Sequence, residues 1–295
     1  MTPMLVVVAQ RWVDARPHVD SLTGEVRTDA RASGASEADL CALEHALRVA
    51  GKLGGRCVAV TAGPPAAEEM LRQALAAGAD EVLRIHSPSA IDPALEDSAE
   101  TARVLATGLT ARFGQVDLVL CGDHSIDRGT GSTPAYLAER LGAAQALGLL
   151  DVEVDGVGLR VLRRLDGGRR ESLAVPLPAV CSVEPTTVRL RRAALPAMLA
   201  ARRAVIPHIA VDAGTGGGAV RVKAVRSYRP RARVLPAPAG DDARWRMLEL
   251  TGALVDRTPP RVVTPSSPAQ AAEELLGFLH EHGYLAAGAP AGGAR

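Results

Sequence analysis

The sequence predicts an α/β protein with a doubly wound, mostly parallel sheet, a β-hairpin insertion and an extended C-terminal arm that ends in a helix. Three observations support this prediction. Short apolar runs alternate with helical patterns in the first half of the chain, and strand-like alternation around a glycine turn follows Gly148. A long segment rich in Pro, Gly and Arg comes after that, and it is expected to bury little surface by itself.

Four strand–helix units account for the first half. The predicted strands are short apolar runs, at Leu5–Ala9, Arg56–Val60, Glu81–Ile85 and Leu118–Cys121. The predicted helices have a capping residue or strong helix formers; one follows Ser36, two are Ala66–Ala77 and Ser98–Arg112, and the last begins at about Thr133. The polar segment 12–35 is expected to be irregular. In such a sheet the ligand crevice lies at the carboxyl ends of the parallel strands.

The second half predicts a hairpin and then a loose arm. Val152–Leu165 and Glu171–Val175 alternate as strands, and the glycines of Asp166-Gly167-Gly168 suit the turn between them. Pro178–Val183 returns to a buried strand. We therefore expect a nucleotide-binding α/β domain over 1–184, an extended basic recognition arm or linker over 185–268, and a docking helix with a tail over 269–295. This helix, Ala269–His282, places Leu275, Leu276 and Leu279 on one side.

Composition and cysteine usage narrow the class of protein. Of the 295 residues 47% are hydrophobic but only 2% are aromatic, so the core is expected to consist of Ala, Val and Leu. The four cysteines form no CxxC pair, which favours reduced core thiols over disulfides or zinc ligands. With no signal peptide and no apolar run of transmembrane length, the expected location is the cytoplasm, without stable membrane insertion.

Charge is unevenly distributed along the chain. The segment Arg189–Arg233 has eleven Arg or Lys residues and one acid, Asp212, although the whole chain has a net charge of only +1. Such asymmetry predicts an arm that faces a partner. Tyr228 is its one aromatic residue, which argues against nucleic acid and for an acidic protein surface. A solvated extension remains the alternative.

The candidate site is the strand–loop–helix stretch Asp117–Gly142. Thr133 is expected to be the N-cap of a helix with Pro134 at its first position, so that unpaired N–H groups face the strand end, where a phosphate can bind. Gly129 and Gly131 would let the backbone approach the ligand, and hydroxyls would donate from Thr130, Ser132 and Thr133. The alternative is an ordinary turn.

Other chemistry is disfavoured in this stretch. His124, Ser125 and Asp127 are neighbours on one short loop and unsuited to a Ser-His-Asp triad. The sequence also has neither a Gly-Lys-Ser/Thr phosphate loop nor a Gly-x-Gly-x-x-Gly opening. We therefore predict no catalytic and no metal-binding residues.

Several motifs, in order and over nearly the whole length, resemble the β subunit of electron transfer flavoproteins. The motifs are Leu5–Asp14, Ser36–Leu47, Ala59–Pro64, Leu71–Asp80, Ser125-Ile126-Asp127 with Thr130-Gly131, Leu165–Gly168, Leu177–Val180 and Ala194-Leu195-Pro196. The resemblance implies an adenine-nucleotide α-hydrolase-like fold. It also implies a non-catalytic subunit in a heterodimer whose α subunit holds most of the FAD, with AMP bound as a structural nucleotide. Each motif is common by itself; their order and spacing are specific.

The resemblance implies particular site residues. The AMP site would consist of Val8, Ala9, Ser36, Ala62, Asp123, Ser125, Asp127, Arg128, Gly129, Thr130, Gly131, Ser132 and Thr133. Leu195-Pro196 would dock on a flavin-dependent dehydrogenase, and Glu171 would steady the mobile flavin domain. Electrons would then pass to a quinone oxidoreductase or a similar acceptor.

Departures from the family pattern affect which ligand and which branch of the family the sequence predicts. Ser36-Glu37 replaces the usual Asn-Pro, and in the AMP loop Arg128, Gly129 and Ser132 replace glycine, aspartate and glutamine. Arg128 would favour a more negative ligand, so a second FAD is conceivable in place of AMP. With the Ala/Arg/Gly-rich composition, these changes resemble a specialised branch such as the mycofactocin-associated flavoproteins. The alternative function is a stand-alone nucleotide-binding or ATP-hydrolysing α/β protein.

Overall fold

The computed structural model describes residues 3–87, 97–156, 158–185, 188–212, 237–238, 240–252 and 262–284. The chain divides into two compact units, Met1–Arg229 and Pro230–Arg295. Two long stretches of the predicted basic arm, 213–236 and 253–261, and the tail, 285–295, lie outside the described residues.

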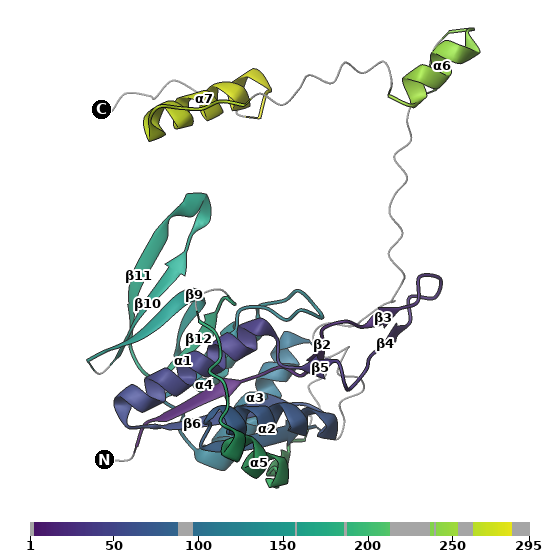
Figure 1. The fold of residues 1–295 in the computed structure, drawn as a ribbon. Helices are drawn as coiled ribbons and strands as arrows, with labels where there is room; N and C mark the ends of the chain where they lie inside the picture. The colour runs from purple at the N-terminus through teal and green to yellow at the C-terminus, as the bar shows by residue number, and fades with distance from the viewer. Residues whose placement is uncertain are drawn as a thin grey trace. The chain divides into compact units, whose positions relative to one another are not determined.

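A nine-stranded sheet forms the centre of the first unit, in the order β11-β10-β9-β12-β8-β1-β6-β7-β13 (Figure 1). Its strands are β1 (Leu5–Ala9), β6 (Arg56–Ala62), β7 (Glu81–His86), β8 (Leu118–Gly122), β9 (Ala144–Asp155), β10 (Gly158–Arg164), β11 (Arg170–Val175), β12 (Ala179–Val183) and β13 (His208–Ala210). Neighbours from β9 through β12, β8, β1, β6 and β7 to β13 pair in parallel, whereas β9, β10 and β11 pair antiparallel. The predicted mostly parallel sheet with a hairpin insertion is confirmed.

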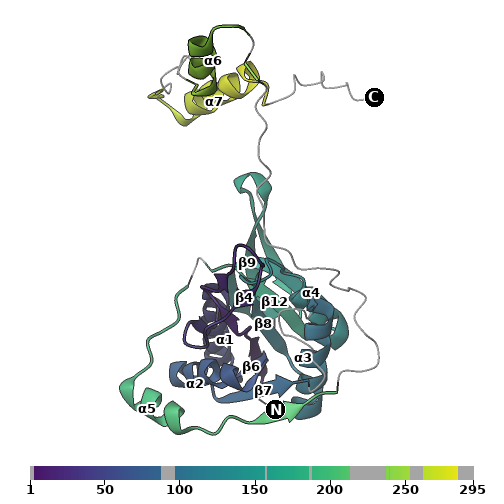
Figure 2. The same cartoon turned by 90° about the vertical axis from the view of Figure 1, so that its right-hand side faces the viewer.

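Helices cover both faces of this sheet, as Figure 2 shows. They are α1 (Glu37–Leu53) and α2 (Glu68–Ala77) on one face, and α3 (Ser98–Phe113) and α4 (Thr133–Leu141) on the other. The central strand β1 explains the arrangement, since its side chains point alternately to the two faces. Val6 and Val8 pack in the apolar cluster with α1 and α2, and Val7 packs in the cluster with α3 and α4. The sheet is therefore doubly wound, as predicted.

Two helix starts in this unit were predicted from capping patterns. At α1 the prediction is confirmed, because the Ser36 hydroxyl accepts a hydrogen bond from the Asp39 N–H at 3.1 Å and completes a capping box. At α4 the prediction is wrong in detail. The helix begins at Thr133, but Ser132 is the N-cap, and it lies in the α region (φ −88°, ψ −16°) without a capping hydrogen bond. An N-cap normally has an extended backbone, which lets its hydroxyl reach back to the first turn.

Two segments contain more structure than the sequence predicts. Segment 12–35 forms two short antiparallel pairs, β2 (Val13–Asp14) with β5 (Ser33–Gly34), and β3 (His18–Val19) with β4 (Val26–Arg27). After residue 184 the chain is not wholly extended, because it forms α5 (Leu195–Arg203) and then β13. The apolar core explains this order, since Ile206 is buried in it and β13 completes the free edge of β7.

The hairpin insertion extends away from the helices in both views (Figures 1 and 2). The predicted strand Val152–Leu165 is in fact two strands, β9 and β10, because Gly156 adopts a positive φ of 60° and turns the chain. At the second turn Gly167 and Gly168 have φ values of 70° and 73°, as the prediction required. A 3₁₀ turn, η2 (Asp166–Gly168), connects β10 to β11.

In its described residues, the second unit contains two helices, α6 (Ala243–Leu250) and α7 (Pro268–Glu281). The predicted helix Ala269–His282 is confirmed to within one residue. Leu275 and Leu276 of α7 are 59% and 49% exposed. No helix within the described ranges is long and apolar enough to cross a membrane.

The four cysteines are free and buried in the first unit, as predicted. Burial raises the pKa of the Cys57 thiol to about 12, so this side chain serves as a small apolar core residue.

Candidate functional site

A cavity opens at the carboxyl ends of β1, β6 and β8, where the sequence predicted a ligand crevice. It contains about 570 Å³ of space not filled by atoms, part of it open to solvent. Its lining residues are Ala9, Gln10, Arg11, Asp39, Ala62, Thr101, Leu105, Cys121, Gly122, His124, Ser125, Thr130, Gly131, Thr133 and Pro134.

Six of the predicted nucleotide-site residues line this cavity: Ala9, Ala62, Ser125, Thr130, Gly131 and Thr133. Two others have structural positions nearby. Val8 is fully buried in the apolar core, and Ser36 caps α1. The remaining five belong to the loop between β8 and α4 but are not among the lining residues; they are Asp123, Asp127, Arg128, Gly129 and Ser132.

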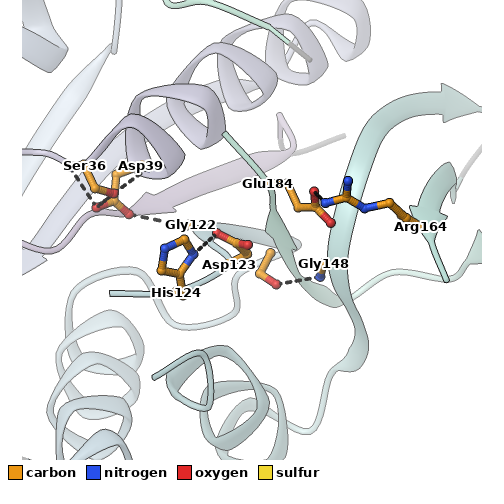
Figure 3. Close-up of polar contacts among 9 residues, drawn as sticks. Ser36, Asp39, Gly122, Asp123, His124, Gly148, Arg164 and Glu184 are labelled. Carbon is orange, nitrogen blue, oxygen red and sulfur yellow. Dashed lines mark hydrogen bonds and ion pairs between the residues drawn. The ribbon is translucent and has the colours of Figure 1, made fainter. Parts of the chain in front are cut away.

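Asp39 lies at the wall of the cavity, and the sequence analysis did not identify it. One carboxylate oxygen accepts a hydrogen bond from the Ser36 hydroxyl at 2.9 Å, and the other accepts one from the Gly122 N–H at 3.3 Å (Figure 3). The Arg11 N–H also approaches it, at 3.4 Å. The side chain therefore connects the exit of β1, the start of α1 and the end of β8. Because it is only 6% exposed, burial raises its pKa to about 6 against the hydrogen bonds that lower it.

This raised pKa predicts a pH-dependent stability. Between about pH 4 and pH 6 the unfolded chain has lost the Asp39 proton while the folded chain retains it, so the free energy of unfolding falls as the pH rises. The shift from 3.8 to about 6 corresponds to about 3 kcal/mol. We expect Asp39→Asn to remove this fall. In urea denaturation, the free energy of unfolding of Asp39→Asn relative to that of the native chain should therefore increase from pH 4 to pH 7. Glu37→Gln, at an exposed acid on the same helical turn, is the control. Equal slopes in native and Asp39→Asn chains would contradict the assignment.

An ion pair connects two loops beside the cavity. The Arg11 guanidinium donates to both carboxylate oxygens of Asp127, with its Nη2 at 2.7 Å and its Nε at 3.1 Å. Burial by itself would raise the pKa of Asp127, but the hydrogen bonds from Arg11 hold it below its ordinary value. Asp127 is thus already paired, and Arg11 is the guanidinium that lines the cavity. The sequence predicted a cationic role for Arg128, which is not among the lining residues of the cavity.

Gln10 supplies an unused polar group in the same cavity. It is 4% exposed, and its amide oxygen has no hydrogen-bond partner among the described residues. Leaving a buried acceptor unpaired costs about 1–3 kcal/mol, so a buried orphan atom in a cavity points to a ligand that would satisfy it. One signal could have identified Gln10 from the sequence, namely its position directly after the predicted first strand.

The loop 123–133 is closed by its own backbone. The Ser125 N–H donates to the Thr130 carbonyl at 2.9 Å, and the Gly129 N–H donates to the Ser125 carbonyl at 2.7 Å. The two predicted glycines serve different purposes. Gly129 has a φ of +64° with open space around it, whereas a Cβ on Gly131 would lie 2.3 Å from the Asp123 carbonyl oxygen.

The polar groups of the cavity do not form a catalytic triad. His124 pairs with its neighbour Asp123 at 2.8 Å (Figure 3). Burial raises the pKa of the Cys121 thiol above its ordinary value, which disfavours a nucleophilic thiolate. Among the described residues, no group of three or more His, Cys, Asp or Glu side chains could hold a metal ion.

The predicted partner-docking residues occupy two separate places. Leu195 begins α5 and is 66% exposed, and on the same helix Met198 and Leu199 are 48% and 50% exposed. Glu171 lies instead on the projecting hairpin, where its carboxylate accepts a hydrogen bond from Arg163 at 2.6 Å. Figures 1 and 2 show α5 and this hairpin at opposite ends of the first unit.

Comparison with known proteins gives a consistent result. The family model described as the electron transfer flavoprotein domain matches residues 24–214. The chain is 35% identical to Protein FixA of Azorhizobium caulinodans over 183 residues, which are 60% of this chain and 64% of that protein. It is 36% identical to the electron transfer flavoprotein subunit beta of Homo sapiens over 169 residues, covering 57% of this chain and 65% of that protein. Protein FixA of Rhizobium meliloti is 31% identical over 230 residues, 74% of this chain and 77% of that protein.

The matched region includes α5, every strand of the nine-stranded sheet except β1, and the cavity-lining residues from Asp39 onward. The chain spans a little under two thirds of the length of the first of these relatives, 64%. Since the family match nonetheless extends over more than half of the sequence, this chain belongs to the electron transfer flavoprotein family and is of its β-subunit type.

Proposed function

We propose that this chain is the β subunit of a heterodimeric electron transfer flavoprotein. In this function it binds a nucleotide in the cavity, pairs with an α subunit that holds most of the FAD, and presents α5 to a flavin-dependent dehydrogenase. Electrons pass through the FAD toward a quinone oxidoreductase or a similar acceptor, and the chain catalyses nothing alone. The observation that carries the proposal is the cavity at the ends of β1, β6 and β8, with the orphan amide oxygen of Gln10 in its wall.

An adenine nucleotide such as AMP fits the groups that line the cavity. The Gln10 oxygen can accept a hydrogen bond from an amine, and the hydroxyls of Ser125, Thr130 and Thr133 can donate. The start of α4 lies in the same wall, so its N–H groups and its dipole favour a phosphate. Close backbone contact at Gly131 supports this role of the loop. We therefore retain the loop residues of the predicted site and add Gln10, Arg11 and Asp39.

The cavity wall contains one acidic group that an anionic ligand would perturb, Asp39. Asp127 is neutralised by Arg11, and at neutral pH Asp39 is the remaining carboxylate in the wall. Because its pKa is about 6, a nearby phosphate would favour the protonated form, and binding of AMP is expected to take up a fraction of a proton.

The FAD, when bound in the heterodimer, supplies the one-electron chemistry, and this chain supplies docking and support. Leu195, Met198 and Leu199 form an exposed apolar ridge on α5, which we call the docking ridge. An exposed apolar patch of this kind marks a protein interaction site. Leu275 and Leu276 of α7 are also exposed, and we assign this helix to the α subunit. To steady the flavin domain, Glu171 would have to release Arg163 and pair with a charged group of that domain.

The composition of the purified complex tests the proposal. The chain is co-expressed with its α subunit, and the denatured complex is analysed for flavin and nucleotide. One FAD with one AMP per heterodimer is the expected result. Two FAD molecules per heterodimer would mean that a second FAD, and not AMP, occupies the cavity. A colourless chain that releases ADP or turns over ATP by itself would overturn the proposal in favour of a stand-alone nucleotide hydrolase.

A further inference from the structure

Glu44 of α1 and Arg191 connect two parts of the chain that are far apart in sequence. The Glu44 carboxylate accepts three hydrogen bonds from Arg191, from its backbone N–H at 3.1 Å, its Nε at 3.0 Å and its Nη2 at 3.1 Å. Arg48 donates a fourth, at 2.8 Å. Arg191 lies four residues before Leu195, where α5 begins.

Burial distinguishes this contact from an ordinary surface ion pair. The Glu44 side chain is 5% exposed and the Arg191 side chain 46% exposed. Burial by itself would raise the pKa of Glu44, but the hydrogen bonds from Arg191 and Arg48 hold it below its ordinary value. Exposed pairs contribute little because water screens them, whereas a bidentate arginine on a buried carboxylate also fixes geometry. The pair holds the backbone of residue 191 against α1.

The other end of α5 is also attached to the first unit. Ala201, on its last turn, is 6% exposed, and Ile206 is buried in the apolar core. β13 then pairs in parallel with β7. Between these two attachments α5 packs against α2, while Leu195, Met198 and Leu199 remain on the outside.

We propose that the Glu44–Arg191 pair is a positioning clamp that holds the docking ridge in its binding orientation before the dehydrogenase arrives. The proposal rests on the docking role assigned to α5 above. A ridge that is already ordered loses less conformational entropy on binding, which increases affinity without adding a contact. If releasing the clamp reduces the docking-competent fraction to about a tenth, the apparent affinity falls about tenfold.

A distance measurement tests the clamp without any partner. Nitroxide labels are placed on the full chain at Lys52→Cys, on the exposed end of α1, and at Leu199→Cys, and the spin–spin distance is measured. The native cysteines are buried, which protects them from the label. Glu44→Gln is the test variant, because it keeps the shape of the side chain and removes the carboxylate only from Arg191 and Arg48, which are both about half-exposed to water. Arg192→Gln is the control, since Arg192 is exposed and makes no ion pair in the described part of the chain.

We expect one narrow distance distribution in the labelled parent and in Arg192→Gln, and a distribution at least twice as broad in Glu44→Gln. Arg191→Lys, which keeps the charge but loses the bidentate contact, is expected to give an intermediate width. An unchanged distribution in Glu44→Gln would overturn the clamp.

A kinetic measurement tests the positioning role in the unlabelled heterodimer, with the dehydrogenase that reduces it. Glu44→Gln is expected to raise KM for that enzyme about tenfold at unchanged kcat. Arg191→Lys, made in the native chain, is expected to raise KM by a smaller factor. If Leu195→Ala raises KM but Glu44→Gln does not, the positioning role is wrong. If neither variant changes KM, the docking role of α5 fails, and the distance measurement alone decides whether the clamp holds the helix.

Discussion

Replacing Leu195 with alanine is expected to lower kcat/KM for reduction by the client dehydrogenase ten- to a hundredfold, with the flavin still bound. Leu195 is 66% exposed at the first position of α5, so its side chain is available to a partner and supports little of its own fold. Burying an exposed leucine in a pocket contributes about 1.5–3 kcal/mol. Since every 1.4 kcal/mol is about a factor of ten, losing that burial gives the expected decrease. The measurement is steady-state reduction of the purified heterodimer, alongside its absorption spectrum.

Leu22 provides a matched control. It is 82% exposed on a turn of segment 12–35, far in sequence from α5 and outside the docking ridge. Leu22→Ala removes the same atoms from the surface and should leave both reduction and flavin content unchanged. If Leu195→Ala instead loses flavin in proportion to activity, the residue supports the heterodimer and the docking assignment is wrong.

The parallel sheet could be predicted because its strands are buried on both faces. Leu5–Ala9 and Leu118–Cys121 are continuous apolar runs for this reason, and their bounds agree with β1 and β8 to within a residue. Ser36 was identifiable because a capping residue acts within its own first turn. These are local signals, which sequence patterns record well.

Contacts between distant segments could not be predicted in the same way. Asp39 reads as an acid in the first turn of a helix, and only the fold brings the Gly122 N–H, 83 residues away, to its carboxylate. The Arg11–Asp127 pair spans 116 residues. The order in 195–210 likewise comes from tertiary contacts, because Ile206 and the edge of β7 fix a segment whose composition suggested a loose arm. The sequence therefore located the cavity but missed both Arg11 and Asp39 in its wall.

Replacing Gly131 with alanine is expected to lower the affinity for AMP at least a hundredfold. The added Cβ would lie 2.3 Å from the carbonyl oxygen of Asp123, well inside any normal contact. Because the obstacle is backbone, the two sides of the loop must separate, and the hydrogen bond from the Ser125 N–H to the Thr130 carbonyl would break. Ser125, Thr130 and Gly131 line the cavity together, so opening the loop displaces three contacts at once. Titration calorimetry with AMP on the nucleotide-stripped heterodimer measures the loss.

Gly129 and Gly131 lie in one loop, but an added side chain would meet open space at Gly129 and backbone at Gly131. Substitutions at the two positions therefore distinguish a need for close backbone approach from a need for an ordered loop. A Cβ on Gly129 has nothing within 4 Å, but its φ of +64° costs a non-glycine residue about 1–2 kcal/mol. Gly129→Asn, which tolerates this conformation better, should lower stability slightly and leave AMP affinity within a few-fold. If Gly129→Asn loses AMP as severely as Gly131→Ala, general loop order is the requirement. If Gly131→Ala binds AMP normally, the loop is not the wall of the nucleotide site, and the ligand of the cavity must be held by Gln10, Asp39 and the ends of β1 and β6 alone.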